Sequence, residues 1–163
     1  MQVYLLRHGI AEDRRPGRSD AERKLTEEGK EKLRRVLIQA KEAVGSPALI
    51  LTSPLIRAVE TAEIAAEVLG YRGTIPRTEA LLPSSTPLAV WKTLRDNAAA
   101  KAILMAGHEP LLSETAGYLL GVPRAAVDFR KGALMRIDVD DLTGTPRGVL
   151  EWLLTPRLAG HCG

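Results

Sequence analysis

The sequence VYLLRHG (residues 3–9) shows both how the chain begins to fold and where chemistry is placed on it. Four apolar or aromatic residues, Val3 to Leu6, predict a buried strand. The strand then ends abruptly in Arg7, His8 and a glycine. Arginine and histidine are side chains that can hold an anion. The carboxyl end of this strand is therefore a candidate anion site.

The rest of the chain alternates strands with helices. The predicted helices are residues 26–45 (capped by Thr26), 53–70 (capped by Ser53, with Pro54 in the first turn), 86–99 (capped by Thr86) and 110–121. The further predicted strands are residues 48–53, a short one within 73–82, 101–107, 132–139 and 149–155.

This alternation predicts an α/β fold with three layers, α/β/α. The expected sheet is mostly parallel and doubly wound, with an antiparallel C-terminal hairpin at its edge. There is no internal repeat, low-complexity segment or linker, and 163 residues fit one domain, so residues 1–163 are expected to form a single domain.

The composition is that of an ordinary globular protein, with 45% hydrophobic residues, 26% charged residues and a net charge of +3. RRPGR (residues 14–18) is the densest basic stretch, and we expect an exposed loop that could also attract an anionic substrate. Without a basic run, an apolar run of about 18 residues or a signal segment, we expect no nucleic acid and no membrane as partner. The single cysteine, Cys162, cannot form an internal disulfide, which favours a cytoplasmic location.

Three predicted strands end in polar residues of related chemistry. The first ends at Arg7-His8-Gly9, the second at Thr52-Ser53-Pro54 with Arg57 close behind, and the third at Gly107-His108-Glu109-Pro110. Ligands of open parallel sheets bind at the carboxyl ends of strands, and helix N-termini there favour anions. We therefore expect two arginines and two histidines to surround a phosphate.

Residue types define the roles in such a site. The planar guanidinium groups of Arg7 and Arg57 suit pairs of phosphate oxygens. One histidine of the pair His8 and His108 could attack phosphorus, while the other could stay protonated and neutralise developing charge. These groups supply nucleophile and charge, so no metal and no organic cofactor is expected.

Other chemistries lack their signatures. Two distant histidines without paired cysteines do not make a zinc site. No G-x-S-x-G elbow, phosphate-binding loop or G-x-G-x-x-G turn is present, and Cys162 is not followed by the arginine of a cysteine phosphatase. His161 lies in a small-residue tail, where we expect no catalytic role.

The segments LLRHGIAE, LTEEG, TSPLIRAVETA and GHEP resemble the histidine phosphatase superfamily, which includes the cofactor-dependent phosphoglycerate mutases. Over residues 1–134 the chain is most similar to its SixA phosphohistidine phosphatase group. The resemblance implies that His8 is the nucleophile, that Arg7 and Arg57 bind the phosphoryl group, and that His108 completes the pocket. Arg23 matches a basic position of the group and is a candidate second-tier phosphate or substrate contact.

The sequence differs from the mutases of the superfamily in one respect, the general acid that protonates the leaving group. Glu79 is the nearest candidate, but its context does not match the mutase motif, and it could simply end a short exposed strand. A weak or absent acid suits a phosphohistidine substrate, because its imidazole leaves more easily than an alkoxide. The short chain also leaves little length for a lid beyond residues 10–24, so we expect an open pocket.

The leading hypothesis is a phosphatase that removes phosphate from phosphohistidine on a protein, such as a phosphotransfer domain or a phosphocarrier. The alternatives are a phosphatase acting on small phosphoesters and a non-catalytic module that binds phosphoproteins. Inorganic phosphate or sulfate is expected to bind in the pocket of either phosphatase.

Overall fold

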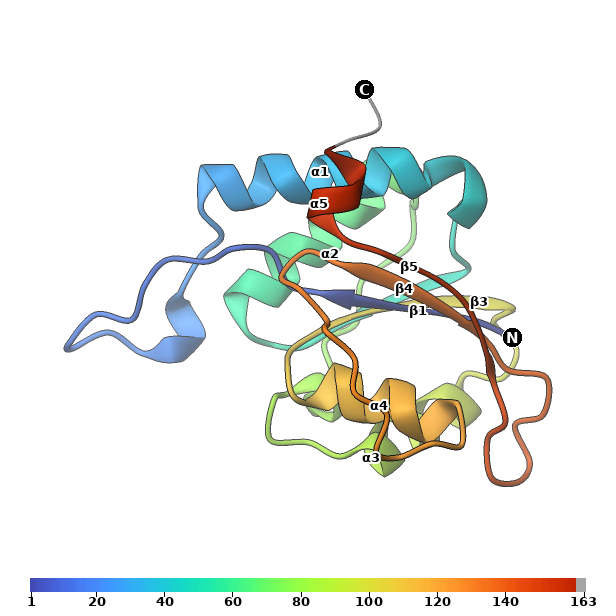
Figure 1. The fold of residues 1–163 in the computed structure, drawn as a ribbon. Coiled ribbons are helices and arrows are strands. Elements are labelled where there is room, and N and C mark those ends of the chain that lie inside the picture. The colour runs from blue at the N-terminus through green and yellow to red at the C-terminus, as the bar shows by residue number, and fades with distance from the viewer. Residues whose placement is uncertain (161–163) are drawn as a thin grey trace.

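In the computed structural model, which describes residues 1–160, one five-stranded sheet lies between two layers of helices (Figure 1). The strands are β1 (Gln2–Arg7), β2 (Leu49–Thr52), β3 (Ala102–Gly107), β4 (Leu134–Asp138) and β5 (Val149–Leu154). The α-helices are α1 (Glu27–Val44), α2 (Ile56–Leu69), α3 (Pro87–Asp96), α4 (Leu111–Leu119) and α5 (Pro156–Ala159). Two 3-10 helices, η1 (Asp20–Glu22) and η2 (Glu79–Leu81), lie in the connections.

The strand order is β2-β3-β1-β4-β5. β1, β2 and β3 are parallel to one another, whereas β4 and β5 form an antiparallel hairpin beside β1. These findings confirm the predicted α/β class, the parallel core and the hairpin at the edge. In the parallel part, Arg7 pairs with Gly107 and Thr52 pairs with Ala106, so three strands end together at one edge of the sheet.

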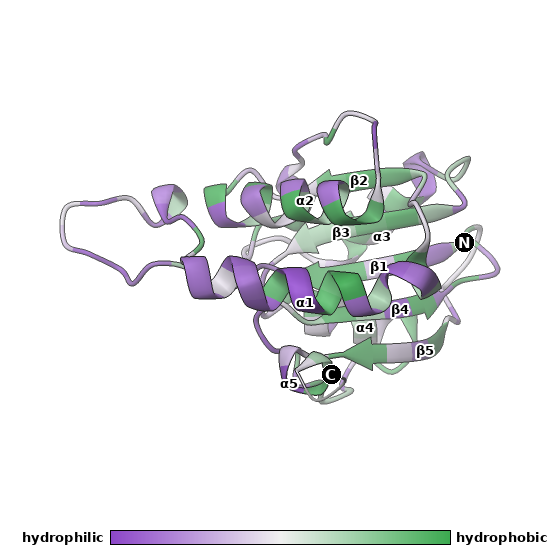
Figure 2. Cartoon of the chain, turned by 90° about the horizontal axis from the view of Figure 1, so that it is seen from above, coloured by the Kyte–Doolittle hydropathy of each residue, from purple (hydrophilic) through white to green (hydrophobic). Residues whose placement is uncertain are grey.

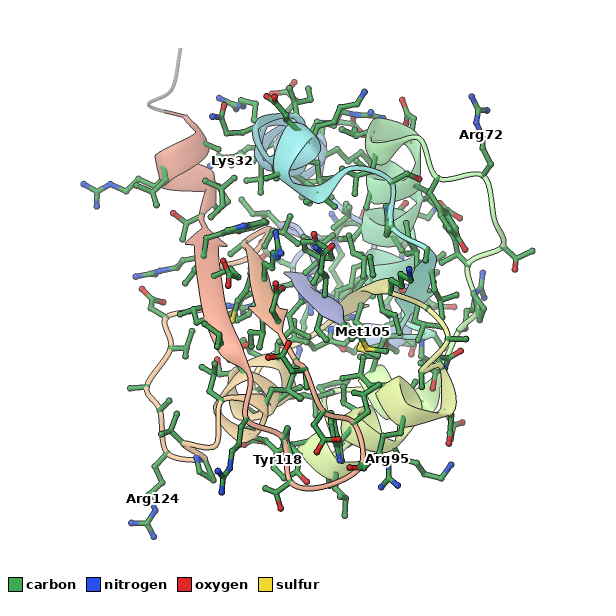
Figure 3. All side chains as sticks on the ribbon, turned by 90° about the vertical axis from the view of Figure 1, so that its right-hand side faces the viewer. Lys32, Arg72, Arg95, Met105, Tyr118 and Arg124 are labelled. Carbon is green, nitrogen blue, oxygen red and sulfur yellow. The ribbon has the colours of Figure 1, made fainter. Side chains whose placement is uncertain are left out.

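The central strand β1 is buried on both faces and contributes to both layers of the core. Val3 and Leu5 pack with α3 and α4, whereas Tyr4 and Leu6 pack with α1 and α2. A strand covered on both faces must be apolar at every position, which explains the continuous run in the sequence. Figure 3 shows Met105 of β3 inside the molecule, while Arg72 and Arg124 point outward.

The helix α1 begins and ends as the sequence predicts. The hydroxyl oxygen of Thr26 accepts a hydrogen bond from the N–H of Gly29 (3.0 Å), and Gly45 ends the helix with φ of 65°. Its apolar stripe faces the sheet beside α2, and its exposed residues are mainly hydrophilic, apart from Ile38 (Figure 2). Within residues 1–160 no helix is long and apolar enough to span a membrane.

Two local predictions are wrong. The helix α2 begins at Ile56 after Leu55, and Ser53 does not cap it, because the Ser53 hydroxyl is engaged elsewhere. The short strand expected within residues 73–82 is reduced to a single bridge between Thr52 and Arg77, followed by η2.

Gly29 in the first turn of α1 allows the helix to touch the loop that leaves β1. A Cβ atom at this position would lie 2.1 Å from the carbonyl oxygen of Ile10. Alanine favours a helix over glycine by about 0.5–1 kcal/mol, but this contact with a backbone atom cannot be relieved by turning a side chain. The tight contact therefore fixes the loop after β1 against α1.

We predict that Gly29→Ala lowers the free energy of unfolding by about 1–3 kcal/mol, because overpacking outweighs helix propensity. Guanidinium chloride unfolding at pH 7 measures the change. Gly144→Ala is the matched control, since a Cβ there meets nothing within 4 Å. A Gly29→Ala protein as stable as the wild type would show that the loop can move away.

Candidate active site

The parallel register of β1 and β3 brings the two predicted histidines together. His8 follows β1 and His108 follows β3, and the N–H of His8 donates to the carbonyl oxygen of Gly107 (3.0 Å). Their ring centroids are 5.0 Å apart. The residues are 7% and 2% exposed, so both rings are buried.

A backbone carbonyl fixes the tautomer of His8. Nδ1 of His8 lies 2.7 Å from the carbonyl oxygen of Gly9, which can only accept a hydrogen bond. The proton of the neutral ring is therefore on Nδ1, and Nε2 keeps its lone pair. The N–H of Gly9 donates to the hydroxyl of Thr61 (3.2 Å), which in turn donates to the carbonyl of Arg57 (2.7 Å). These bonds hold the loop that orients His8.

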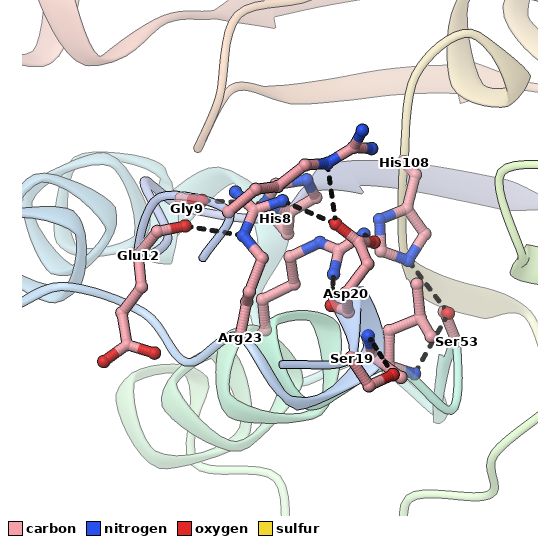
Figure 4. Close-up of polar contacts among 12 residues, drawn as sticks. His8, Gly9, Glu12, Ser19, Asp20, Arg23, Ser53 and His108 are labelled. Carbon is pink, nitrogen blue, oxygen red and sulfur yellow. Dashed lines mark hydrogen bonds and ion pairs between the residues drawn. The ribbon is translucent and has the colours of Figure 1, made fainter. Parts of the chain in front are cut away.

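The ring of His108 is held from the end of β2. Its Nε2 lies 2.9 Å from the hydroxyl oxygen of Ser53, as Figure 4 shows. The N–H of Ser53 donates to the carbonyl of Ala106 (3.0 Å), and the hydroxyl oxygen also accepts from the N–H of Leu55 (3.3 Å). Ser53 thus positions a ring of the site, a role that its cap-like sequence context concealed.

The two predicted arginines reach the same site from different elements. Arg7 ends β1 and donates through Nη1 to the carbonyl of Phe129 (2.5 Å). Arg57, in the first turn of α2, is 5% exposed and donates to the backbone carbonyl (2.7 Å) and the carboxylate (3.0 Å) of Asp20. Within residues 1–160, Nε of Arg7, Nε of Arg57 and Nδ1 of His108 are buried without a hydrogen-bond partner. Buried polar atoms are normally paired, so these three unpaired nitrogens are candidate hydrogen-bonding groups for a ligand.

Burial favours the neutral form of both histidines. It lowers the pKa of His8 to about 4, and the charges of Arg57 and Arg7 add to this effect. It also lowers the pKa of His108 to about 3, with contributions from His8 and Arg57. Both shifts oppose protonation, and the expectation that one histidine is protonated during the reaction stays a prediction. A doubly charged anion between them would oppose these effects and raise both pKa values.

The structure adds Asp20, which the sequence did not single out, to the site (Figure 4). Its carboxylate lies 3.0 Å from Nη2 of Arg57, 2.8 Å from Nη1 of Arg23 and 3.1 Å from Nε of Arg14. The hydrogen bond from Arg23, together with the charge of Arg57, lowers the pKa of Asp20 to about 2. Asp20 is thus ionised at neutral pH and balances Arg57. It lies 37 residues from Arg57, a separation that no local pattern reveals.

The remaining candidates lie around this cluster. Arg23 is joined to Arg57 through Asp20, and its Nε donates to the carbonyl of Glu12 (2.5 Å). The loop of residues 14–18 is exposed, as predicted, and lines a pocket of about 350 Å³ next to Asp20. Glu79 is exposed in η2 and lines a different surface pocket. His161 and Cys162 lie outside the described residues, and within residues 1–160 no group of three or more His, Cys, Asp or Glu residues could hold a metal ion.

Comparisons with known proteins bear on the family and the fold of the chain. The sequence profile of the histidine phosphatase superfamily (branch 1) matches residues 3–81. An uncharacterized protein of Picosynechococcus sp. is 33% identical over 148 residues, which cover 82% of this chain and 87% of that protein. The structure of the protein histidine phosphatase SixA with tungstate superposes with a TM-score of 0.85 at 25% identity, covering 96% of this chain and 98% of SixA.

The α-ribazole phosphatase of Shigella flexneri shares the fold with a TM-score of 0.70 at 19% identity, over 96% of this chain and 97% of that one. The chain therefore belongs to the histidine phosphatase superfamily. This membership, together with the likeness to the protein histidine phosphatase SixA, supports a phosphatase, a hydrolase that acts on phosphorylated substrates.

The pKa values of the two histidines predict a loss of stability in mild acid. Both folded-state values lie below the 6.5 of an ordinary histidine, so below pH 6.5 the unfolded chain binds protons that the folded chain does not. We expect the free energy of unfolding to fall between pH 7 and pH 5 by roughly 1–2 kcal/mol for each histidine. Urea unfolding in phosphate-free buffer measures this, and a His8→Asn/His108→Asn protein should lose most of the pH dependence. Equal pH dependence in both proteins would contradict the assignment.

The ion pair between Asp20 and Arg57 predicts a stronger anion site once the carboxylate is removed. We expect Asp20→Asn to bind inorganic phosphate about 10-fold more tightly, because the competing negative charge is lost while the side-chain shape is kept. Isothermal titration calorimetry measures the affinity, with Asp13→Asn in the same exposed loop as the control. Equal or weaker binding by Asp20→Asn would mean that the carboxylate chiefly holds Arg57 in place.

Proposed function

We propose that the protein is a phosphohistidine phosphatase that works through a covalent phosphohistidine on His8. Nε2 of His8 attacks phosphorus and forms a new N–P bond, while the N–P bond of the substrate breaks. The substrate imidazole takes a proton from solvent as it leaves. Water then attacks the phosphorus on His8, so that an O–P bond forms, the Nε2–P bond breaks and one proton passes to solvent, which releases inorganic phosphate and restores the neutral ring.

The state of the His8 ring carries this proposal. A nucleophile needs a lone pair on an atom free of other bonds, and the hydrogen bond of Nδ1 to Gly9 leaves Nε2 in that state. The pKa of about 4 keeps the ring unprotonated at neutral pH. A module that only bound phosphate would gain nothing from a buried neutral imidazole, which attracts an anion less than imidazolium does.

The unpaired nitrogens of Arg7, Arg57 and His108 support the binding of a phosphoryl group next to His8. Arginine donors are always charged and match phosphate oxygens in pairs, so they stabilise charge that develops on the oxygens during transfer. The SixA structure with tungstate is consistent with this, because tungstate is also a tetrahedral oxyanion.

The leaving group is the feature that favours phosphohistidine over an alkyl ester. Asp20 is bonded to Arg57, and its pKa of about 2 leaves it without a proton to donate at pH 7. Glu109, whose charge acts on Arg7, has both carboxylate oxygens bonded to Ser113. Glu79 lies exposed in η2. An imidazole that leaves without a strong general acid suits this set of residues. The proposed substrate is therefore phosphohistidine on a partner protein, such as a phosphotransfer domain or phosphocarrier.

A phosphatase of small phosphoesters is the second candidate, favoured by the shared fold with the α-ribazole phosphatase. This function would need a proton donor for an alkoxide, and Glu79 is its candidate. Glu79→Gln should then abolish ester turnover while leaving turnover of phosphohistidine peptides within about twofold, because imidazole needs less assistance.

We predict that a phosphohistidine peptide labelled with ³²P transfers its label to the wild-type protein within one turnover. The label should be acid-labile and base-stable, as expected of an N–P bond, and should be absent from His8→Ala. Turnover by His8→Ala should fall on the order of 10³-fold or more. Rapid quenching followed by electrophoresis detects the label, and phosphate release measures turnover.

Other results would favour other functions. Turnover without a labelled protein would indicate direct attack by water, with Arg7 and Arg57 as clamps. Ester turnover without peptide turnover would favour the small-molecule phosphatase. Tight binding of phosphoprotein without turnover, unaffected by His8→Ala, would identify a binding module.

A further inference from the structure

A basic pocket adjoins the candidate active site on the side of Arg7. Its volume is about 710 Å³, and it lies between the end of β1, the helices α1 and α5, and the segment that precedes β4. Figure 3 shows Lys32, which contributes to it, on α1 near α5. The charged side chains that line the pocket are Arg7, Lys32, Arg130, Lys131, Arg157 and the single carboxylate Asp128.

Two of these cations are balanced locally, whereas Lys131 is not. Arg130 pairs with Asp128 (2.7 Å), and Lys32 pairs with Glu28 (2.5 Å). Lys131 is exposed, and no hydrogen bond or ion pair of its ammonium group occurs within residues 1–160. Exposed lysines commonly have no partner, so this absence alone does not indicate a binding site. The position of Lys131 next to the candidate active site is what makes it a candidate contact.

That position is fixed by the backbone of β1. The N–H of Gly132 donates to the carbonyls of both Arg7 (3.1 Å) and His8 (3.0 Å), and the N–H of Arg7 donates to Ala133 (3.1 Å). Gly132 has φ of 76°, a left-handed conformation that glycine adopts without strain, and this turn directs the chain from Lys131 into β4. Lys131 is thereby anchored beside the nucleophile, and its charge contributes to the low pKa of His8.

Arg7 connects the pocket to the chemistry. It lines the pocket, and its unpaired Nε belongs to the site around His8. A substrate whose phosphoryl group is at His8 could therefore place a neighbouring group in this pocket, beside Lys131. An accessible pocket with a net positive charge attracts negatively charged groups of a partner. This attraction is strongest at low ionic strength.

We propose that this basic pocket binds an acidic side chain, Asp or Glu, carried by the partner protein beside its phosphohistidine, and that Lys131 is the principal contact. The inference rests on the proposed function and specifies its substrate: a phosphohistidine protein with a carboxylate flanking the phosphorylated imidazole. Lys131 is thus a residue that determines specificity, separate from the groups that transfer the phosphoryl group.

The test compares two phosphohistidine peptides that differ only in flanking residues, Asp and Glu in one and Asn and Gln in the other. We expect the wild type to show a kcat/KM about 5-fold higher for the acidic peptide, because KM is lower for that peptide while kcat is the same. The preference should decrease as salt is added. Lys131→Met should bring the ratio close to one, and Lys131→Glu should invert it. Lys101→Met, at the opposite end of the sheet from the histidines, should keep the wild-type ratio. An unchanged ratio in Lys131→Met overturns the proposal.

Binding measurements separate this proposal from the proposed function. The same peptide pair, carrying a non-hydrolysable phosphoryltriazole in place of phosphohistidine, gives dissociation constants without turnover. A Lys131-dependent preference in binding, without peptide turnover, would support the pocket and refute the phosphohistidine phosphatase. Turnover of both peptides with equal kcat/KM would support the phosphohistidine phosphatase and refute the pocket. A preference for 3-carboxyphenyl phosphate over phenyl phosphate, without a preference between peptides, would assign the pocket to small esters and overturn the proposal.

Discussion

The hydrogen bond between Nδ1 of His8 and the carbonyl of Gly9 is the interaction on which the chemistry of this site depends. It exists because the loop after β1 is confined: Gly9 donates to Thr61 on one side, and a Cβ on Gly9 would lie 3.2 Å from the carbonyl of Gly29. The helix α1 approaches closely enough to confine this loop because Gly29 has no side chain. Gly9 after the strand and Gly29 in the first turn of α1 thus set the orientation of one imidazole ring.

A second constraint is electrostatic. The site places Arg7 and Arg57 beside two buried histidines, and it avoids excess positive charge by keeping both rings neutral and by binding Asp20 to Arg57. An incoming dianion would act on these features in the same direction, because it would compete with the carboxylate for the arginine and would favour protonation of a histidine. The free site is therefore prepared for phosphate by local charge balance.

Much of this arrangement could be predicted from the sequence. Apolar runs predicted β1 and the hairpin, and the cap and the apolar periodicity predicted α1. Burial of a strand on both faces, or of one side of a helix, requires apolar residues at positions that can be recognised in the sequence. The histidines could be paired because parallel strands end at one edge. Asp20 could not be found, because its contact with Arg57 depends on how a long loop folds back. The prediction that Ser53 caps a helix is wrong. A serine hydroxyl in this position can bond either to a helix N-terminus or to His108, and the sequence does not show that β2 and β3 align so as to place Ser53 beside His108.

The most direct test of the central claim is the protonation state of His8 itself. A long-range ¹H–¹⁵N correlation spectrum of the histidine rings, recorded at about pH 6 in phosphate-free buffer and assigned with His8→Asn, reports both charge and tautomer. The account predicts a neutral His8 with its proton on Nδ1 and an unprotonated Nε2. A charged ring, or a neutral ring with its proton on Nε2, would contradict the account, because neither leaves the lone pair that the proposed attack on phosphorus requires.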